Sequence, residues 1–433
     1  MPSIRNAFDL LCNDPALFRQ RVKSNCSRLL DGPVAFISGK TPLYRDILPG
    51  PPPSALGPRC LTVFSCNPFL PSGVGASIRA QCALLVGMGY SMDALFYVRD
   101  ELSRATRGAL FRQFDRSALI FPKTARQDRL ADGVTAADLD TWCGRELLDA
   151  CACMLDNGRY VAIIVHQPWL SRVLELAPGG TKKYLFMHDN FSGRAALFEK
   201  QGLPRRLAWL NLSDEEQARC MRRADTIFAV QDEERAIFER QINGERQVVT
   251  IRIPFADKTA LPLPGNRGKL TVGIIASANE NNRSAVESFV RLWEREPALQ
   301  EAAELHIAGD VGRFICSREP SVHVLGRVET LDAFYADLDL AVNPDCSGTG
   351  IKVKSLEALS FGRPLLCSSA GSMGLQSRYP WHNLPNQPAM VACAVALVRQ
   401  PSLLPSLRAI SVALFHQYNH MEEYLDTLRP TKA

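Results

Sequence analysis

Residues 341–375, AVNPDCSGTGIKVKSLEALSFGRPLLCSSAGSMGL, are the most informative stretch of this 433-residue chain. Residues 338–343 form a short apolar run typical of a buried strand, and residues 344–350 form a glycine-containing loop. Residues 351–361 have the apolar spacing of a helix, and Gly362 is placed to end it. The pattern predicts a strand, a loop and a helix, with the loop delivering its N–H groups to the helix N-terminus.

This loop has the chemistry of an anion site. Gly348 and Gly350 allow the backbone to approach a ligand closely, and Thr349 supplies a hydroxyl group. The helix dipole favours a negative group in front of the helix, and Lys352 and Lys354 add positive charge near the same end. A glycine turn of this kind is also common as a tight connection, so the loop alone leaves both interpretations open.

Glu357 is the polar residue of the predicted helix that we expect to bind a ligand. Its neighbours Leu356, Ala358, Leu359 and Phe361 are apolar, and the helix lies between two predicted strands. A helical glutamate is usually a solvated surface residue. The apolar surroundings favour a partly buried carboxylate at a binding site instead.

The segment GTGIKVKSLEALSFGRPLL, followed by a glycine turn, resembles the donor-nucleotide motif of retaining glycosyltransferases with the GT-B fold. This large family, glycosyltransferase group 1 or family 4-like, takes sugars from nucleotide sugars. The resemblance implies that Glu357 holds the nucleotide ribose. Many members carry another Glu eight residues upstream, next to the donor sugar, where this chain has Thr349. The further donor contacts implied by the resemblance are Ser347, Gly348, Thr349, Gly350, Ile351 and Lys354.

The segments before this motif extend the resemblance. KLTVGIIA, residues 269–276, predicts the first strand of a C-terminal nucleotide-binding domain. SANENNRSAVESFVRLW resembles the family's following loop and helix, where the resemblance implies that Arg283 meets the donor diphosphate. Strand and helix patterns continue to alternate through residues 304–344. This alternation predicts a parallel sheet with its binding site at the carboxyl ends of the strands.

The N-terminal half contains a second unit of the same class. Residues 60–90 predict a strand, a glycine loop and an amphipathic helix over residues 77–86. The resemblance implies that Gly73 and Gly75 of the loop approach the donor. The fragment GVGAS lacks the full GxGxxG spacing of a dinucleotide site, and a plain tight turn is the alternative.

Two apolar strand patterns in this half, RYVAIIVHQPW and KKYLFMHDNFSGR, each end in a histidine. The resemblance implies that His188 faces the cleft near the donor sugar and the acceptor, while His166 ends the preceding strand. A structural histidine at a strand end is the alternative for either residue. Asp189 could set the tautomer of His188, although adjacent strand residues point to opposite faces.

The predicted fold class is α/β of the GT-B type, with two Rossmann-like, doubly wound parallel-sheet domains facing a cleft and an N-terminal helical extension. The extension covers residues 1–58, and the N-terminal acceptor domain covers residues 59–258. A proline-rich linker follows, with the domain boundary near residue 260. The nucleotide-sugar domain covers residues 266–402, and residues 403–433 predict a helix crossing back to the N-terminal domain.

Composition limits the class of protein. With 46% hydrophobic residues and no apolar run of the ~20 residues that span a bilayer, we expect a soluble, cytoplasmic protein without a signal peptide. The 13 cysteines lack paired metal spacing, which predicts reduced thiols and no metal site. The basic segment 104–129 could contact anionic lipid at the inner face of the membrane, or it could be a solvated helix face. The sequence shows no nucleic-acid-binding module.

The expected activity is a hexosyltransferase-like reaction (EC 2.4) in glycan biosynthesis. A nucleotide-diphosphate sugar is the donor, and the acceptor is a glycan, a lipid-linked molecule or a protein. We expect retention of anomeric configuration, no cofactor and no metal, with His188, Arg283 and Lys352 as the catalytic residues. The alternatives are a catalytically inactive GT-B protein that binds a nucleotide sugar or a partner, and a sugar-nucleotide epimerase.

Overall fold

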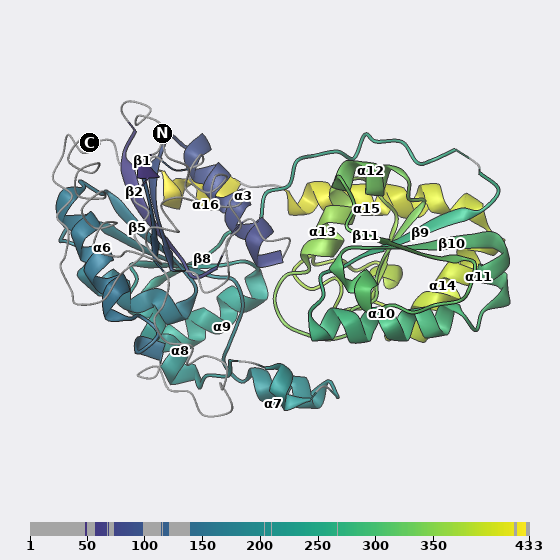
Figure 1. Ribbon diagram of the computed structural model, residues 1–433, viewed down its shortest axis with the longest axis horizontal. Helices are drawn as coiled ribbons and strands as arrows, with labels where there is room; N and C mark the ends of the chain where they lie inside the picture. Colours follow the sequence, from purple (N-terminus) through teal and green to yellow (C-terminus); the bar gives the residue numbers. More distant parts are fainter. Residues whose placement is uncertain are drawn as a thin grey trace, which may run out of the picture.

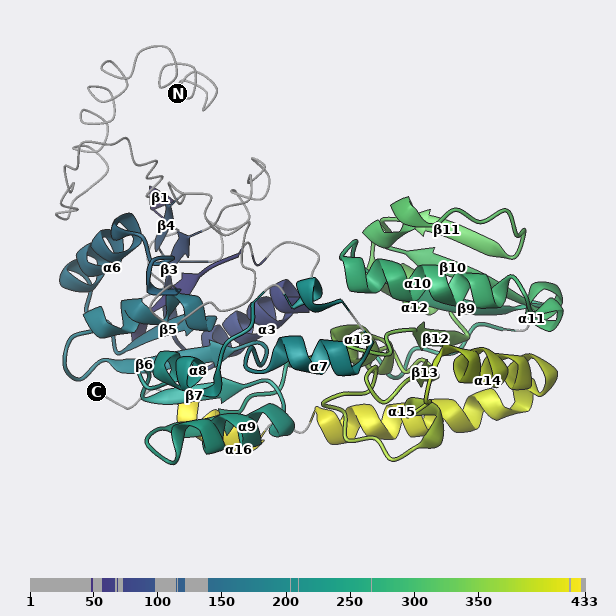
Figure 2. The same cartoon turned by 90° about the horizontal axis from the view of Figure 1, so that it is seen from below.

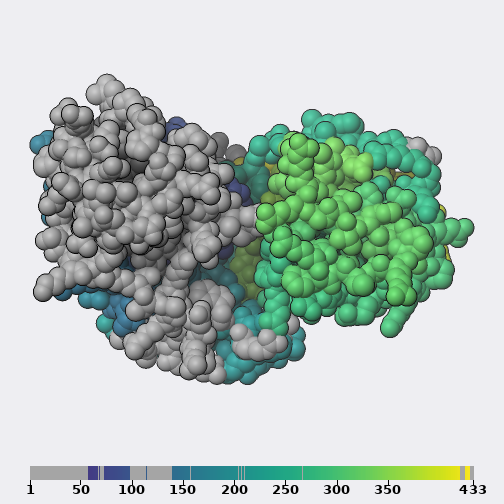
Figure 3. Space-filling view, in the orientation of Figure 1, coloured from purple at the N-terminus to yellow at the C-terminus, as the bar shows by residue number. Residues whose placement is uncertain are grey.

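The computed structural model describes residues 48–49, 57–66, 68, 73–97, 114, 116–120, 139–202, 204–208, 210–265, 267–419 and 422–429. These residues form two α/β domains that lie side by side along the long axis of the molecule (Figure 1). In the space-filling view the second domain, coloured green, forms a rounded lobe of its own (Figure 3).

The N-terminal domain is built on an eight-stranded sheet with the order β1-β4-β3-β2-β5-β6-β7-β8. All neighbouring strands are parallel except β1 and β4, which are antiparallel. Every residue of β3 and β5 is buried, as expected for parallel strands covered on both faces. The strands are β1 (Leu48–Pro49), β2 (Arg59–Phe64), β3 (Ser91–Tyr97), β4 (Arg116–Ile120), β5 (Ala162–His166), β6 (Lys182–Met187), β7 (Thr226–Ala229) and β8 (Gln247–Thr250).

Helices cover both faces of this sheet. One face packs against α6, η2, α8 and α9, and the other packs against α3 and the C-terminal α16 (Glu422–Leu428). These elements and the remaining helices of the domain are α3 (Gly73–Gly87), α6 (Arg145–Asn157), η2 (Pro168–Leu176), α7 (Arg194–Lys200), η3 (Arg205–Leu207), α8 (Asp214–Met221) and α9 (Asp232–Ile242).

The C-terminal domain is built on a five-stranded, wholly parallel sheet with the order β11-β10-β9-β12-β13. The helices α10, α11 and α14 cover one face, and α12, α13 and α15 cover the other (Figure 1). Figure 2 shows the five strands following one another in this order. The strands are β9 (Leu270–Ile275), β10 (Ala303–Ala308), β11 (Val322–Gly326), β12 (Leu340–Asn343) and β13 (Leu365–Cys367). The helices are α10 (Glu280–Trp293), α11 (Pro297–Ala302), η4 (Asp310–Phe314), α12 (Leu331–Ala336), α13 (Val353–Ser360), η5 (Pro380–His382), α14 (Gln387–Arg399), η6 (Pro401–Leu403) and α15 (Leu404–Tyr418).

The chain end differs from the single helix that the sequence pattern predicts. The helix α15 stays on the C-terminal domain, where Phe415 and Tyr418 are buried against it. A separate helix, α16 (Glu422–Leu428), lies on the N-terminal domain, where Leu428 is buried and the Tyr184 hydroxyl donates to the Thr427 carbonyl. Within the described part of the chain, no single helix is long and apolar enough to cross a membrane, and the bent pair of α14 with η6 and α15 passes that test jointly.

The predicted N-terminal extension and the basic segment 104–129 lie largely outside the described residues. The short strand β1 belongs to the stretch that the sequence assigned to the extension, yet it pairs with β4 at the edge of the first sheet. The predicted helical extension therefore contributes a strand to the N-terminal domain.

The linker between the domains is attached to the C-terminal domain by a buried arginine. The Arg363 side chain is fully buried, and its guanidinium donates to four backbone carbonyls. Two of these carbonyls belong to the linker, at Leu261 and Pro262, at 2.7 and 2.8 Å. Arg408 of α15 donates to the linker carbonyls of Thr259 and Leu261. The two guanidinium groups thus hold the linker against the second domain.

We predict that Arg363→Met lowers the free energy of unfolding by about 3–5 kcal/mol, because four buried carbonyls lose their donor. Urea denaturation followed by circular dichroism measures the change. Arg399→Met at the exposed end of α14 is the control, with an expected loss below about 1 kcal/mol. Equal, small losses in both variants would show that the Arg363 bonds are not needed for stability.

Candidate functional site

A cavity of about 680 Å³ lies between the two domains, and both domains supply its walls. In the C-terminal domain its walls include the residues that end β9 and follow β10, β11 and β12. In the N-terminal domain its walls include residues that follow β6, β7 and β8, together with the first turns of α3. The carboxyl ends of two parallel sheets therefore face one cavity, where α/β folds commonly bind ligands.

The helix α3 forms the N-terminal wall because it approaches α13 closely. It begins at Gly73, four residues earlier than the sequence predicts, so Gly73 and Gly75 lie in a helical turn rather than in a loop. Gly73 lines the cavity, and a Cβ atom there would meet the Val353 side chain at 3.3 Å. Gly75 is buried inside α3 and lies outside the cavity lining. The glycine at position 73 thus serves contact between the domains.

The glycine loop after β12 meets the N-terminal domain at two points. Gly348 and Gly350 have φ angles of 96° and 71°, which side chains disfavour. The Gly348 N–H donates to the Gln201 side chain at 3.0 Å, and Gly350 lies beside the Asp189 carboxylate. Gly350, Thr349 and Ile351 line the cavity, whereas Gly348 and Ser347 lie outside its lining.

Thr349 occupies the position where the family resemblance often places a glutamate. Its Oγ1 atom is buried and has no hydrogen-bond partner among the described residues. Since Thr349 lines the cavity, this hydroxyl is available to a ligand there.

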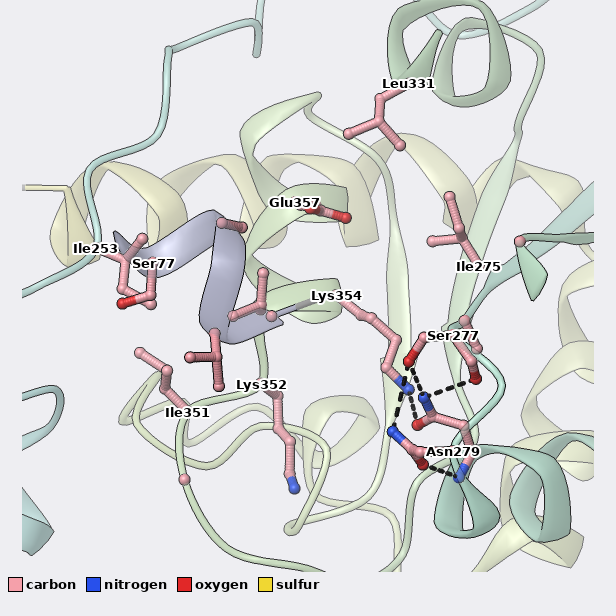
Figure 4. A pocket seen from close by; sticks show the side chains of 18 of the residues that line it. Ser77, Ile253, Ile275, Ser277, Asn279, Leu331, Ile351, Lys352, Lys354 and Glu357 are labelled. Atoms are coloured by element: carbon pink, nitrogen blue, oxygen red, sulfur yellow. Dashed lines mark hydrogen bonds between the residues drawn. The ribbon is translucent and has the colours of Figure 1, made fainter. Parts of the chain in front are cut away.

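The two lysines that follow the loop have different environments (Figure 4). The Lys354 ammonium donates to Asn282 at 2.8 Å and to the Asp345 carboxylate at 3.0 Å, so it lies at the start of α10. Burial alone would raise the pKa of the Asp345 carboxyl, but Lys354 and Lys352 outweigh it and lower that pKa. Lys352 points away from this contact and donates to the Ser347 and Thr349 carbonyls, each at 3.3 Å. Burial lowers the pKa of Lys352.

Glu357 of α13 lines the cavity, as do residues of the first turns of α3. Burial raises the pKa of its carboxyl to about 7, against the opposing charges of Arg79 and Lys354. Arg79 belongs to α3 and also lines the cavity, and its guanidinium donates to the Pro68 carbonyl. A carboxylate from one domain and a guanidinium from the other therefore share the cavity.

His188 lies at the end of β6, where it lines the cavity as part of a buried chain of side chains. Its Nε2 is 3.0 Å from His166 Nδ1, and its Nδ1 is 3.3 Å from the Ser77 hydroxyl. Burial lowers the pKa of His188 to about 3, so both rings are neutral at neutral pH. His188 therefore acts as a neutral hydrogen-bonding group.

The tautomers of the two histidines follow from their partners. His166 Nε2 is buried with no partner in the described part of the chain, and an unmatched lone pair costs less than an unmatched N–H. His166 Nδ1–H then donates to His188 Nε2, and His188 Nδ1–H donates to Ser77. The Ser77 hydroxyl hydrogen is left free to donate into the cavity. Asp189 does not set this tautomer, because its carboxylate pairs with Arg194 at 3.0 Å.

Arg283, which the sequence analysis expects at the donor diphosphate, lies outside the cavity lining in this structure. Its contact with a diphosphate stays a prediction. Its guanidinium pairs with Glu287 at 2.7 Å and stacks over the Phe314 ring at 4.8 Å. Arg283 therefore faces along the outer surface of α10, one position past Asn282, which does face the cavity.

Sequence reasoning missed several cavity residues that the fold brings together. Asn279 caps α10 by accepting a hydrogen bond from the Asn282 N–H at 2.8 Å. Because asparagine is a preferred residue at helix starts, the sequence could have indicated this position. Arg79 and Ser77 lie two residues apart on α3, and their place at the cavity depends on contact between the domains. Of the described His, Cys, Asp and Glu residues, one group of three has metal-ligand spacing, and it lies on β10 and β11 outside the cavity lining.

Comparisons with known proteins agree with this architecture. Residues 269–380 match the family model of glycosyl transferases group 1. Comparison with curated protein sequences gives no match.

Three solved structures cover 86% of this chain at 12% identity. They are Anabaena Alr3699/HepE in complex with UDP and glucose (TM-score 0.58, 97% of that chain), sucrose-phosphate synthase from Thermosynechococcus elongatus (TM-score 0.61, 97%) and the trehalose-6-phosphate structure from E. coli bound with UDP-2-fluoro glucose (TM-score 0.57, 99%). A likeness at this identity concerns the fold. The predicted fold class, two parallel-sheet Rossmann-like domains of the GT-B type, is confirmed.

The environment of Glu357 predicts a pH-dependent stability. Its pKa in the folded chain is about 7, above the ordinary value of 4.5, so its contribution to stability is complete below the ordinary value and is lost as pH rises through about 7. Between about pH 5 and about pH 8, we expect the wild type to lose about 1–3 kcal/mol more than Glu357→Gln. Urea denaturation at both pH values measures this difference. Glu239→Gln, at an exposed ion pair on α9, should behave as the wild type; an identical pH response of Glu357→Gln would contradict the raised pKa.

Proposed function

We propose that this protein is a glycosyltransferase that moves a sugar from a nucleotide-diphosphate sugar to an acceptor, with the interdomain cavity as its active site. The observation that supports this most directly is the position of Glu357, a partly buried carboxylate beside a glycine loop and Lys354 at the carboxyl ends of the second sheet. The match of residues 269–380 to glycosyl transferases group 1 covers this same part of the chain. The bound UDP compounds of two structural neighbours are consistent with the proposed donor class.

In this proposal the C-terminal domain holds the nucleotide. The Glu357 carboxylate accepts hydrogen bonds from the ribose hydroxyls, which are its natural donors in a cavity of this polarity. The diphosphate lies between the glycine loop and the start of α10, where Lys354 is fixed by Asn282 and Asp345. As the glycosidic bond breaks, charge grows on the leaving diphosphate. Ammonium and backbone N–H groups already in place stabilise that charge without reorganisation.

The sugar lies on the N-terminal side of the cavity. His188 orients the Ser77 hydroxyl, which can donate to a sugar oxygen. The free Thr349 hydroxyl lies on the opposite wall, at the position where the resemblance expects a contact to the donor sugar. The Ser77 and Thr349 hydroxyls are neutral donors that suit sugar oxygens, and Arg79 adds a basic group on the same helix as Ser77.

We further propose that transfer retains the anomeric configuration and needs no cofactor and no metal ion. Lys354 and Lys352, together with the N-terminal ends of α10 and α13, supply positive potential that a divalent cation provides in other enzymes. The acceptor class is a glycan, a lipid-linked molecule or a protein.

A second candidate is a protein that binds the nucleotide sugar without transferring it. Thr349 favours this candidate, because a hydroxyl replaces the carboxylate that many relatives place beside the donor sugar. A hydroxyl cannot stabilise developing positive charge at the sugar as a carboxylate does. If the chain does transfer the sugar, catalysis depends on its contacts with the acceptor and the diphosphate instead.

The decisive experiment uses a panel of nucleotide sugars, with excess EDTA, and measures release of free nucleoside diphosphate. We expect slow release from one donor class, and Glu357→Gln should weaken binding of the same nucleoside diphosphate by about 5-fold to about 150-fold, which corresponds to about 1–3 kcal/mol. Glu239→Gln on the surface of α9 is the matched control.

Each other outcome of this panel has a definite meaning. Binding without release, with acceptors present, favours the second candidate. An epimerised sugar would identify an epimerase, and loss of release on chelation with recovery on added Mg²⁺ would contradict metal independence. Unchanged affinity of Glu357→Gln for every nucleotide would remove Glu357 from the site.

We also predict a separate effect for His188. His188→Ala should lower turnover by about 10-fold or more while nucleoside diphosphate affinity changes little, because the lost bond orients Ser77 on the sugar side. Ser77→Ala, which leaves the histidine pair intact, should lower turnover in the same direction. His416→Ala, at an exposed ion pair, is the control. Suppose instead that His188→Ala lowers the melting temperature, while His188→Ala and Ser77→Ala both keep normal turnover at saturating substrate. The histidine pair then serves folding.

A further inference from the structure

A group of three side chains with metal-ligand chemistry lies on the edge of the second sheet, away from the cavity. Residues 303, 305 and 307 of β10 pack into the core under α10 and α14, so the alternate residues Glu304 and His306 face the other side of the sheet. The parallel register pairs His306 with His323 of the edge strand β11. Paired residues in neighbouring strands share a face, and the two imidazoles therefore meet beside Glu304.

The three groups converge on one point without bonding one another. His306 Nε2 lies 3.7 Å from Glu304 Oε2, and His323 Nε2 lies 3.8 Å from the same oxygen. These separations are too long for hydrogen bonds. The ligand atoms all lie within 4.8 Å of one another. Ligands about 2.1 Å from a tetrahedral zinc ion are about 3.4 Å apart, so a small movement of each side chain would complete the geometry.

The surroundings leave one ligand atom unsatisfied and orient another. His323 Nε2 is buried and has no hydrogen-bond partner among the residues that the structure describes. His306 Nδ1 lies 3.7 Å from Asp337 Oδ2, so the same small movement that would complete the metal geometry would also have to bring these two atoms into hydrogen-bond distance. Asp337 in turn pairs with Arg267. A carboxylate behind a histidine is the usual arrangement for directing the other ring nitrogen at a metal.

We propose that Glu304, His306 and His323 bind a Zn²⁺ ion, with Asp337 orienting His306 and the fourth position open to water. Two imidazoles and one carboxylate are nitrogen and oxygen ligands that zinc accepts in a tetrahedral site. His323 is 41% exposed and Glu304 is 40% exposed, so an ion can reach the site from solvent.

The ion would tie the edge strand β11 to β10. Chain segments that directly follow these strands carry Gly309, Asp310 and Arg327, which line the interdomain cavity. Asp310 follows His306 by four residues, about 13 Å along an extended chain. The ion therefore braces one wall of the cavity from a distance and takes no part in sugar transfer. The proposed site differs from the expectation of no metal site. Its ligands have no paired spacing in the sequence, because strand register brings His306 and His323 together.

The test uses the full-length protein, stripped of metal with a chelator and passed through a desalting column. Titration with Zn²⁺ in competition with a chromophoric chelator measures stoichiometry and affinity, and Co²⁺ substitution reports coordination geometry by its visible absorption. We expect one equivalent with a tetrahedral Co²⁺ spectrum and a rise in melting temperature. His323→Ala and Glu304→Gln should each weaken Zn²⁺ binding by about 10-fold or more, and Asp337→Asn by about 10-fold.

Two matched controls separate this site from other ligands. His416→Ala removes an exposed histidine beside a carboxylate elsewhere, and Cys316→Ser removes an exposed thiol; both variants should keep the bound equivalent. His323 is partly exposed on an edge strand, so its truncation should leave the circular dichroism spectrum of the stripped protein unchanged. The proposal is overturned if the protein binds no Zn²⁺ at micromolar concentration. It is also overturned if His323→Ala keeps the bound Zn²⁺ ion and Cys316→Ser loses it, which would mean an adventitious ion only.

Discussion

The buried guanidinium of Arg363 is the constraint on which the domain arrangement depends. A desolvated cation is tolerated only while carbonyls surround it, and two of its four carbonyl partners belong to the linker. The linker therefore cannot leave the C-terminal domain without exposing an unsatisfied buried charge. Upstream, the Ile253 N–H donates to the Tyr418 hydroxyl of α15 at 3.0 Å, and Ile253 lines the cavity. The chain thus reaches the N-terminal sheet from a fixed point, which places the carboxyl ends of both sheets opposite each other.

The charged groups of the cavity are arranged as pairs of opposite sign. Lys354 is held by Asp345, and Glu357 faces the charge of Arg79. The pKa of about 7 for Glu357 indicates that its carboxylate is poorly compensated at neutral pH. Donors from a ligand would lower the cost of that charge. Under the proposed function, a ligand would offer hydroxyl donors to Glu357 and anionic oxygens to Lys354, which lie three residues apart on α13.

The sequence predicted the fold class because it depends on local signals, and the structure confirms that class. Near-continuous apolar runs such as β5 and β6 indicate buried parallel strands, whatever elements pack against them. The end of the β6 run places His188 at a strand end without any knowledge of its hydrogen-bond partners. Side-chain direction is a different kind of information. Arg283 and Asn282 are adjacent in sequence, yet the rotation of about 100° between successive helix residues directs them to solvent and to the cavity respectively. Arg79 reaches Glu357 only through packing of α3 on α13, and strand register alone unites His306 with His323.

Contacts between the domains also decide how such a cavity can open. Gly73 lies against Val353, the Gly348 N–H bonds Gln201, and Gly350 lies beside Asp189. In all three contacts the backbone of a glycine meets a side chain of the opposite domain, so a side chain at any of these glycines would alter the contact. Movement of the domains apart would separate the Gly348 N–H from the Gln201 side chain unless that side chain follows. Because Glu357 and Arg79 come from opposite sides of this contact, a ligand that engages both would favour the closed arrangement by the difference in its affinity for the two states.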